Sequence, residues 1–159
     1  MPRQNDATSP LSEPAAAIWI VVADAGRARI LSALRHDGQL KELFDLVNPD
    51  ARLQDHDTLS DRAGHVTQGP AGMGHSFEPR ESHSEHIAET FAKDLCHRLN
   101  AARCSGELGR IYLLAAPKFL GLLRNNLDKE THKLVVQELA TDLTRHPLID
   151  IRNTLPAQL

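Results

Sequence analysis

The pattern of hydrophobic and polar positions predicts a strand-rich first third of the chain. Residues 18–23 (IWIVVA) form a continuous, largely β-branched apolar run, which is typical of a buried central strand. Residues 27–34 and 40–47 alternate apolar and polar side chains, and each follows a turn signal, DAG at 24–26 and HDG at 36–38. We therefore predict a meander of three strands, although residues 40–47 would also fit a helix.

The main helix is predicted over residues 84–103. Its apolar side chains recur at four-residue spacing on one face, at Ile87, Phe91, Leu95 and Leu99. Ser82 or Ser84 is the expected cap of this helix, since Glu85 lies three residues after Ser82, as in a capping box. Gly106 is expected to end the helical region.

The last third of the chain predicts alternating elements. Residues 110–116 form an apolar strand, residues 117–123 a helix that begins at a proline, and residues 128–132 a short helical turn. Periodicity leaves residues 133–139 open between strand and helix, and a last short helix is expected after Pro147. A strand, helix and strand in succession require a crossover, so we predict an α/β fold with helices packed on a mixed sheet.

Composition and charge limit the class of protein. The 159 residues are 41% hydrophobic, which fits one domain with a substantial core, and the net charge of -3 gives no global attraction to nucleic acid. The polar, Pro/Ser-rich residues 1–16 are expected to be a disordered lead-in without a signal peptide. The longest apolar run, residues 15–23, is too short to span a bilayer. With only two cysteines, we expect a soluble, cytoplasmic protein without membrane insertion.

Catalytic and metal-binding motifs are sparse. His83 and His86 lie three residues apart and His65 and His75 precede them, but there is no HExxH and no Cys or Asp at a matching offset. Asp24 at the end of the first strand, with Glu85 or Glu89 of the helix, is similar to a two-metal ribonuclease H arrangement. That site needs a further carboxylate near the strand at 110–116, where none occurs, so a turn-forming role for Asp24 is favoured. We expect no bound metal, no cofactor and no complete catalytic constellation.

Four basic residues are candidates for contacts with anions or RNA. Two of them, Arg27 and Arg29, share one face of the second predicted strand by period-two geometry. Lys118 begins a helix directly after a strand, where free backbone N–H groups favour an anion, and Arg124 lies about two turns further on. An ordinary solvated basic face is the alternative interpretation of these residues.

Five phrases of the sequence together resemble one protein family. They are IWIVVADAGRARIL at 18–31, LVNPDARLQDHDTLSDRAG at 46–64, GHSFEPRESHSEHIAETFAKDLCHRL at 74–99, IYLLAAPKFLGLLRNNL at 111–127 and KLVVQELATDLTRHP at 133–147. In this order they closely resemble the bacterial host attachment proteins, described as required for attachment to host cells. The resemblance covers about residues 17–156, which we take as a single domain.

That family is similar in turn to the middle domain of archaeal and eukaryotic peptide-chain release factors and of the ribosome-rescue factor pelota. The resemblance implies a ribonuclease H-like mixed sheet of about five strands flanked by helices. It also implies a long loop between the third strand and the main helix, which fits the polar, aperiodic residues 48–82. It favours a strand for residues 133–139.

The long loop is the part of the resemblance that bears on activity. In release factors this loop carries a Gly-Gly-Gln tip that promotes hydrolysis of peptidyl-tRNA, whereas here residues 68–75 read QGPAGMGH. The hydrolytic role therefore does not carry over. Candidate functional residues at the loop and its junction with the helix are Gln68, Gly72, Gly74, His75, Glu78, His83 and His86. Candidates for ordering the first half of the loop, from the matching family phrase, are Arg52, Asp57, Ser60, Asp61 and Arg62.

The resulting hypothesis is a binding domain that acts on the ribosome or tRNA without hydrolysis. One alternative is a protein-interaction module with a protein partner that supports attachment to host cells. A second alternative is a hydrolase assisted by the histidines or by a metal.

Overall fold

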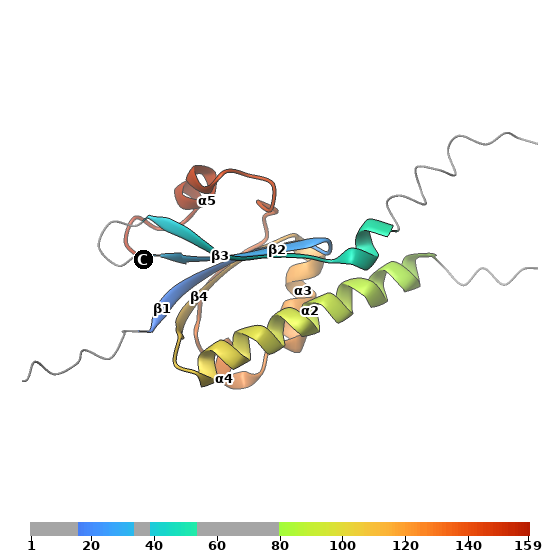
Figure 1. Ribbon diagram of the computed structural model, residues 1–159, viewed down its shortest axis with the longest axis horizontal. Coiled ribbons are helices and arrows are strands. Elements are labelled where there is room, and N and C mark those ends of the chain that lie inside the picture. The colour runs from blue at the N-terminus through green and yellow to red at the C-terminus, as the bar shows by residue number, and fades with distance from the viewer. Residues whose placement is uncertain (1–15, 34–38, 54–79) are drawn as a thin grey trace, which may run out of the picture.

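A single five-stranded sheet forms the centre of the molecule, as the computed structural model shows for residues 16–33, 39–53 and 80–159 (Figure 1). The strand order is β3-β2-β1-β4-β5. β1 (Ala17–Ala23), β2 (Arg27–Ala33) and β3 (Leu40–Val47) form an antiparallel meander. β4 (Leu108–Ala115) runs parallel to β1, and β5 (Val135–Leu139) runs parallel to β4.

The sheet confirms the predicted α/β class and its mixed strand directions. All three strands of the predicted meander are present, and the ambiguous run at 40–47 is a strand. β5 agrees with the strand that the family resemblance favoured for residues 133–139. β1 lies in the middle of the sheet and is paired on both edges. Core side chains also cover both of its faces, so its apolar run is buried.

Helices cover the two faces of the sheet unequally. On one face lie α2 (Arg80–Cys104), α3 (Pro117–Asn126) and the short α4 (Lys129–His132), while α5 (Leu148–Thr154) lies on the other face (Figure 1). Trp19 and Val21 of β1 belong to the core on the α2 side, and Ile18, Ile20 and Val22 to the core on the α5 side. Among the described residues, no helix is both long enough and apolar enough to cross a membrane.

The start of α2 corrects the predicted cap. The helix already includes Arg80, so Ser82 and Ser84 lie inside it rather than ahead of it. The apolar stripe marks only the part of a helix that is packed, and the first strongly buried residue is Ala88. Residues 83–86 are exposed and still helical, so the helix continues beyond its packed part.

The end of α2 agrees with the prediction. Gly106 has a φ of 79°, and its N–H donates to the carbonyl of Arg103 at 3.1 Å. The N–H of Glu107 donates to the carbonyl of Ala102 at 3.0 Å. These two bonds form a Schellman motif, in which glycine takes the left-handed conformation without a steric penalty.

The packed half of α2 generates the first prediction. Leu99 is fully buried against the sheet, whereas His97, on the same helix, is exposed. Leu99→Ala should lower the free energy of unfolding by about 2–5 kcal/mol through reduced burial and a residual cavity. His97→Ala should change it by less than about 0.5 kcal/mol, and urea denaturation measures both. An equal effect of the two changes would contradict this assignment of the core.

The two cysteines provide a second prediction. The buried Cys96 thiol donates to the carbonyl of Leu123 at 3.7 Å, and burial raises its pKa to about 12, whereas Cys104 is exposed. Since the thiolate is the reactive form, a thiol reagent at pH 8 should label Cys104 rapidly and Cys96 only after unfolding. The Cys104→Ser variant should show no fast reaction. Two fast thiols per native chain would refute the buried position of Cys96.

Candidate functional site

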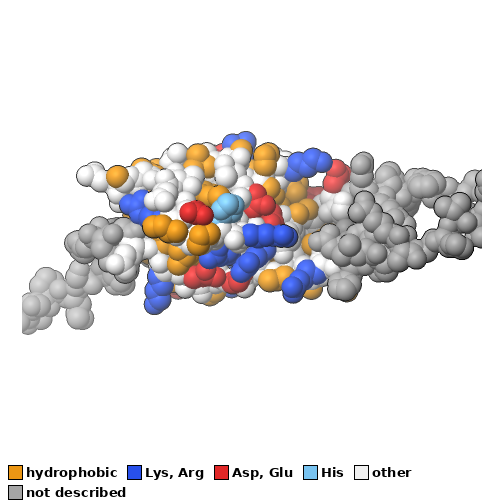
Figure 2. Space-filling model, turned by 90° about the horizontal axis from the view of Figure 1, so that it is seen from above, with side chains coloured by type: hydrophobic (Ala, Val, Ile, Leu, Met, Phe, Trp, Pro, Cys, Tyr) orange, Lys and Arg blue, Asp and Glu red, His pale blue; other side chains and the backbone are white. Residues whose placement is uncertain are grey.

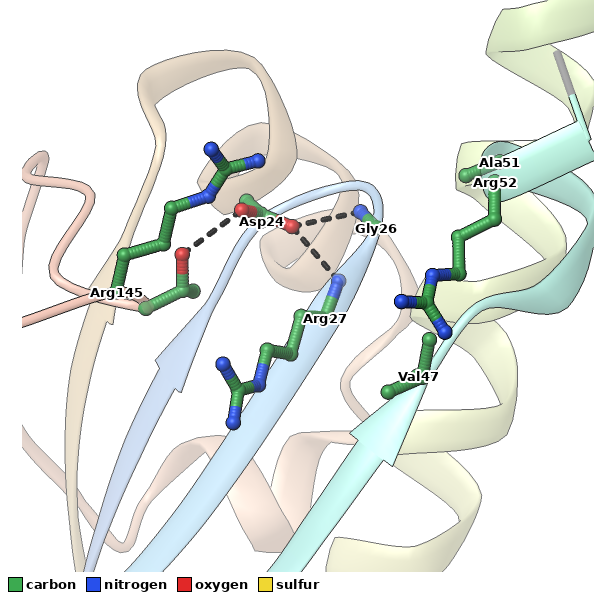
Figure 3. Close-up of a pocket in the computed structure, with 8 residues that line it drawn as sticks. Asp24, Gly26, Arg27, Val47, Ala51, Arg52 and Arg145 are labelled. Carbon is green, nitrogen blue, oxygen red and sulfur yellow. Dashed lines mark hydrogen bonds between the residues drawn. The ribbon is translucent and has the colours of Figure 1, made fainter. Parts of the chain in front are cut away.

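A cleft of 510 Å³ lies at the carboxyl end of β1 (Figure 3). Its walls come from the β1–β2 turn, the end of β3, the helical turn at residues 49–53 and the segment between β5 and α5. The lining residues are Asp24, Gly26, Arg27, Val47, Ala51, Arg52, Thr144 and Arg145. In open sheets with parallel strands, this edge is where ligands usually bind.

Asp24 builds the floor of the cleft. Its Oδ1 accepts hydrogen bonds from the N–H groups of Gly26 at 2.6 Å and Arg27 at 2.7 Å, which fixes the turn between β1 and β2. Its Oδ2 lies 2.9 Å from the Thr144 hydroxyl, whose single hydrogen is shared between Asp24 and the Asp142 carboxylate at 2.7 Å. The predicted turn-forming role of Asp24 is therefore confirmed, and both carboxylate oxygens hold other parts of the chain.

Asn48 attaches the second wall to this turn. It is buried, its side-chain amide donates to the carbonyl of Ala25 at 2.9 Å, and its backbone N–H donates to the carbonyl of Gly26 at 2.8 Å. β3 ends at Val47 and a helical turn follows directly at residues 49–53. The two hydrogen bonds of Asn48 thereby hold Ala51 and Arg52 beside the β1–β2 turn.

Arg29 attaches the third wall, which corrects its predicted place on the surface. Its side chain is buried, with 9% of the residue exposed, and one guanidinium nitrogen donates to Glu42 at 2.7 Å. Another donates to the carbonyl of His146 at 2.7 Å. Arg29 therefore fastens the segment that carries Arg145, and its guanidinium is not presented to solvent.

Three arginines from three different segments surround the cleft (Figure 3). The Arg27 guanidinium forms a two-pronged ion pair with Asp45, at 2.8 and 2.5 Å, and this hydrogen-bonded pair holds the pKa of the Asp45 carboxyl below its usual value. Arg52 and Arg145 are exposed and have no hydrogen bond or ion pair with the described residues. Among the described residues of the lining, the only carboxylate is that of Asp24, which is already hydrogen-bonded to three donors.

The cleft is thus a basic site on a chain with a net charge of -3. Figure 2 views the molecule from the α5 side, where Lys and Arg side chains gather over the middle of the face with Asp and Glu between them. A guanidinium fork matches the oxygens of a phosphate or carboxylate, and partial enclosure strengthens that attraction. The chemistry available here is the binding of an anion.

The other predicted basic residues lie elsewhere. Lys118 is exposed at the start of α3, and Arg124 of the same helix is paired with Glu138 at 2.5 Å. Neither residue lines the cleft. Their role in binding RNA stays a prediction.

The candidates at the loop–helix junction are placed only in part. His83 and His86 are exposed near the start of α2, and the described residues include no group of three or more His, Cys, Asp or Glu side chains that could hold a metal ion. The remaining loop candidates lie outside the described residues, and their roles stay predictions: Gln68, Gly72, Gly74, His75, Glu78, Asp57, Ser60, Asp61 and Arg62.

Several residues that line the cleft lie within phrases of the family resemblance, but nothing in the sequence marks them as residues of one site. Arg145, Thr144 and Val47 were not predicted as site residues, and Arg52 was predicted only as a residue that orders the loop. Thr144 and Arg145 lie in a polar stretch between β5 and α5 without periodicity. Only hydrogen bonds across more than a hundred residues bring them to the β1–β2 turn.

The Asp24–Thr144 hydrogen bond generates a third prediction. Asp24→Ala and Thr144→Val should each destabilise the fold, by about 1–3 kcal/mol. The first removes the hydrogen bonds of the half-buried Asp24 that fix the turn, and the second removes the contacts of the buried Thr144 hydroxyl with Asp24 and Asp142. The double variant should be less destabilised than the sum of the single effects, by about 0.5–3 kcal/mol in denaturation experiments. Thr90→Val is the control, since Thr90 is exposed on α2 and should add independently to Asp24→Ala. Additive effects for Asp24 and Thr144 would argue against this contact.

Comparisons with known proteins bear on the family and the fold. No curated protein matches the sequence. A crystal structure of the archaeal translation termination factor aRF1 is similar, with 18% sequence identity and a TM-score of 0.48. The likeness covers 83% of this chain and 32% of that one, so the chain spans about a third of that factor's length. The model of the family described as protein required for attachment to host cells matches residues 19–155. The match covers most of the chain, which therefore belongs to the family of proteins required for attachment to host cells.

Proposed function

We propose that this domain binds RNA, alone or within an assembly such as the ribosome or a tRNA complex, and acts by binding rather than by catalysis. The observation that carries the proposal is the cleft at the end of β1, where Arg52 and Arg145 present guanidinium groups without carboxylate partners among the described residues. Phosphate groups supply most of the affinity in complexes of proteins with nucleic acids.

The surroundings of the two arginines support an anionic ligand. The walls that carry them are fixed to the β1–β2 turn by Asn48 and Thr144, so the position of each backbone is set before a ligand arrives. A fixed backbone lowers the entropy cost of binding. Arg27 adds a third guanidinium, and its outer N–H groups remain beside the cleft while two of its nitrogens bind Asp45.

The state of Asp24 favours binding over hydrolysis. A general base or metal-binding carboxylate needs an oxygen free to reach the reacting group. Three of the roughly four acceptor positions of the Asp24 carboxylate already receive hydrogen bonds within the protein, so this group is used mainly to hold the fold. The sequence resemblance to the middle domains of release factors and pelota favours the ribosome and tRNA as RNA partners. The absence of a Gly-Gly-Gln tip from residues 68–75 agrees with a role without hydrolysis.

The proposal predicts salt-sensitive binding that depends on the cleft. The wild-type protein should co-sediment with ribosomes, more with ribosomes stalled on a truncated message than with empty ones, and less as salt increases. The Arg52→Gln/Arg145→Gln variant should bind more weakly. The slope of log affinity against log salt should become shallower by roughly 0.7–0.9 for each phosphate that the variant no longer neutralises.

Arg110→Gln is the matched control for this experiment. Arg110 is exposed near the amino end of β4, whereas the cleft lies at the carboxyl ends of the parallel strands. The Arg110→Gln change should lower the binding of ribosomes only slightly. Since Arg110→Gln removes one positive charge and the cleft variant removes two, a loss of binding free energy in the control of half that in the cleft variant or more would indicate a general charge effect. No binding of ribosomes or RNA at any salt would refute the proposed function.

A second candidate function rests on exposed apolar side chains. Phe44, Val47 and Leu53 are 39%, 45% and 65% exposed, and all three lie on β3 or the helical turn that follows it. β3 is an edge strand of the sheet, and an edge strand that exposes apolar side chains favours contact with another protein. A protein partner that supports attachment to host cells would be captured independently of salt and of Arg52 and Arg145, which distinguishes it in the same set of variants.

A further inference from the structure

The cleft has two chemically different ends. Figure 3 shows Arg145 on one side of the Asp24–Gly26 turn, and Arg52 on the other side together with Ala51 and Val47. The Val47 and Ala51 side chains are apolar, and Val47 is 45% exposed beside a charged residue. A ligand that fills the whole cleft therefore meets an apolar surface at one end and guanidinium groups along its length.

The size of the cleft indicates a compact ligand. The cleft has a volume of 510 Å³ and is partly open to solvent, so it has room for a small ligand without enclosing it. Proteins that follow a long single strand use open grooves with aromatic side chains on which the bases stack. None of the described residues that line this cleft is aromatic.

The charges indicate more than one anionic group. Arg52 and Arg145 come from segments 93 positions apart in the numbering, lie on opposite sides of the turn, and each lacks a carboxylate partner among the described residues. One guanidinium fork binds one phosphate through two parallel hydrogen bonds. Two separate forks on different walls, with Arg27 also in the lining, fit a ligand with two phosphates better than a ligand with one.

We infer that the cleft binds a nucleoside carrying two linked phosphate groups, with the nucleoside against Val47 and Ala51, one phosphate at Arg52 and the next at Arg145. This inference deepens the proposed function and rests on it for the choice of a nucleotide ligand. A free nucleoside diphosphate and a 5′-phosphorylated dinucleotide step of RNA both present a nucleoside with two phosphates, joined directly in the first and through a ribose in the second, so the test includes both sources.

The test is a titration of the full chain by calorimetry in EDTA, which removes any contribution from divalent cations. The ligands are adenosine, AMP, ADP, pyrophosphate and the 5′-phosphorylated dinucleotide pApA. ADP or pApA should bind about tenfold or more tightly than AMP, because the second phosphate adds a charge-assisted contact. Tighter binding of ADP would indicate a free nucleoside diphosphate as the ligand, and tighter binding of pApA would indicate RNA.

Three variants assign the parts of the ligand. Arg145→Gln should bring the affinity for the two-phosphate ligand down to that for AMP and leave AMP binding nearly unchanged, whereas Arg52→Gln should weaken both. Ala51→Leu narrows the apolar end without changing the charge, so it should weaken ADP and AMP several-fold more than pyrophosphate. Leu53→Ala is the control, since Leu53 lies on the same helical turn but does not line the cleft. Thermal unfolding monitors the folding of each variant.

The outcomes separate this inference from the proposed function. Equal affinities for AMP, ADP and pApA would overturn the inference, and so would equal effects of Ala51→Leu on pyrophosphate and ADP. If ribosome or RNA binding still depended on Arg52 and Arg145 in that case, the proposed function would stand alone. Binding of ADP with the expected variant effects, but without any binding of RNA, would refute the proposed function and retain the two-phosphate site.

Discussion

β1 is hydrogen-bonded along both edges and buried on both faces, and the rest of the structure follows from that constraint. A strand without an exposed face needs a layer of side chains on each side. α2 and α3 supply one layer, and α5 with the C-terminal segment supplies the other. The C-terminal segment must therefore cross the end of β1 on its way to α5, which is why residues near 144 meet the β1–β2 turn.

Buried polar contacts fix where that crossing occurs. The Arg29 guanidinium is bound by Glu42 and by the carbonyl of His146, and the Thr144 hydroxyl reaches Asp24. A buried charge is tolerated only when it is paired and hydrogen-bonded, so these contacts favour one arrangement of the segment over its alternatives. Arg145 lies between two anchored residues and is exposed, and its location is set by its neighbours rather than by its own contacts.

The arginines of this face divide into those that stabilise the protein and those that remain available. Arg29 is used within the fold, Arg27 is partly used by Asp45, and Arg52 and Arg145 are exposed at the cleft. Membership in the family of proteins required for attachment to host cells gives the lineage of the chain. A fold hosts many activities, so the proposal of anion binding rests on these side chains rather than on the architecture.

The sequence alone determined the elements, because their signals are local. The apolar run of β1, the alternation in β2 and β3, and the glycine at the end of α2 each act within a few residues of the chain. Periodicity did not determine β5, for which the family resemblance was needed, nor the start of α2, since exposed helical turns carry no apolar signal.

Only the tertiary structure decided which basic residues form a site. Arg27 and Arg29 are equivalent by spacing on β2, yet only Arg29 is buried, with its guanidinium hydrogen-bonded to Glu42 and to a carbonyl 117 residues away. Arg52 and Arg145 have no common motif, and they meet at the same cleft because Asn48 and Thr144 fasten their segments to one turn. A local pattern specifies periodicity and turns, whereas the neutralisation of a charge depends on partners that only folding brings within hydrogen-bonding distance.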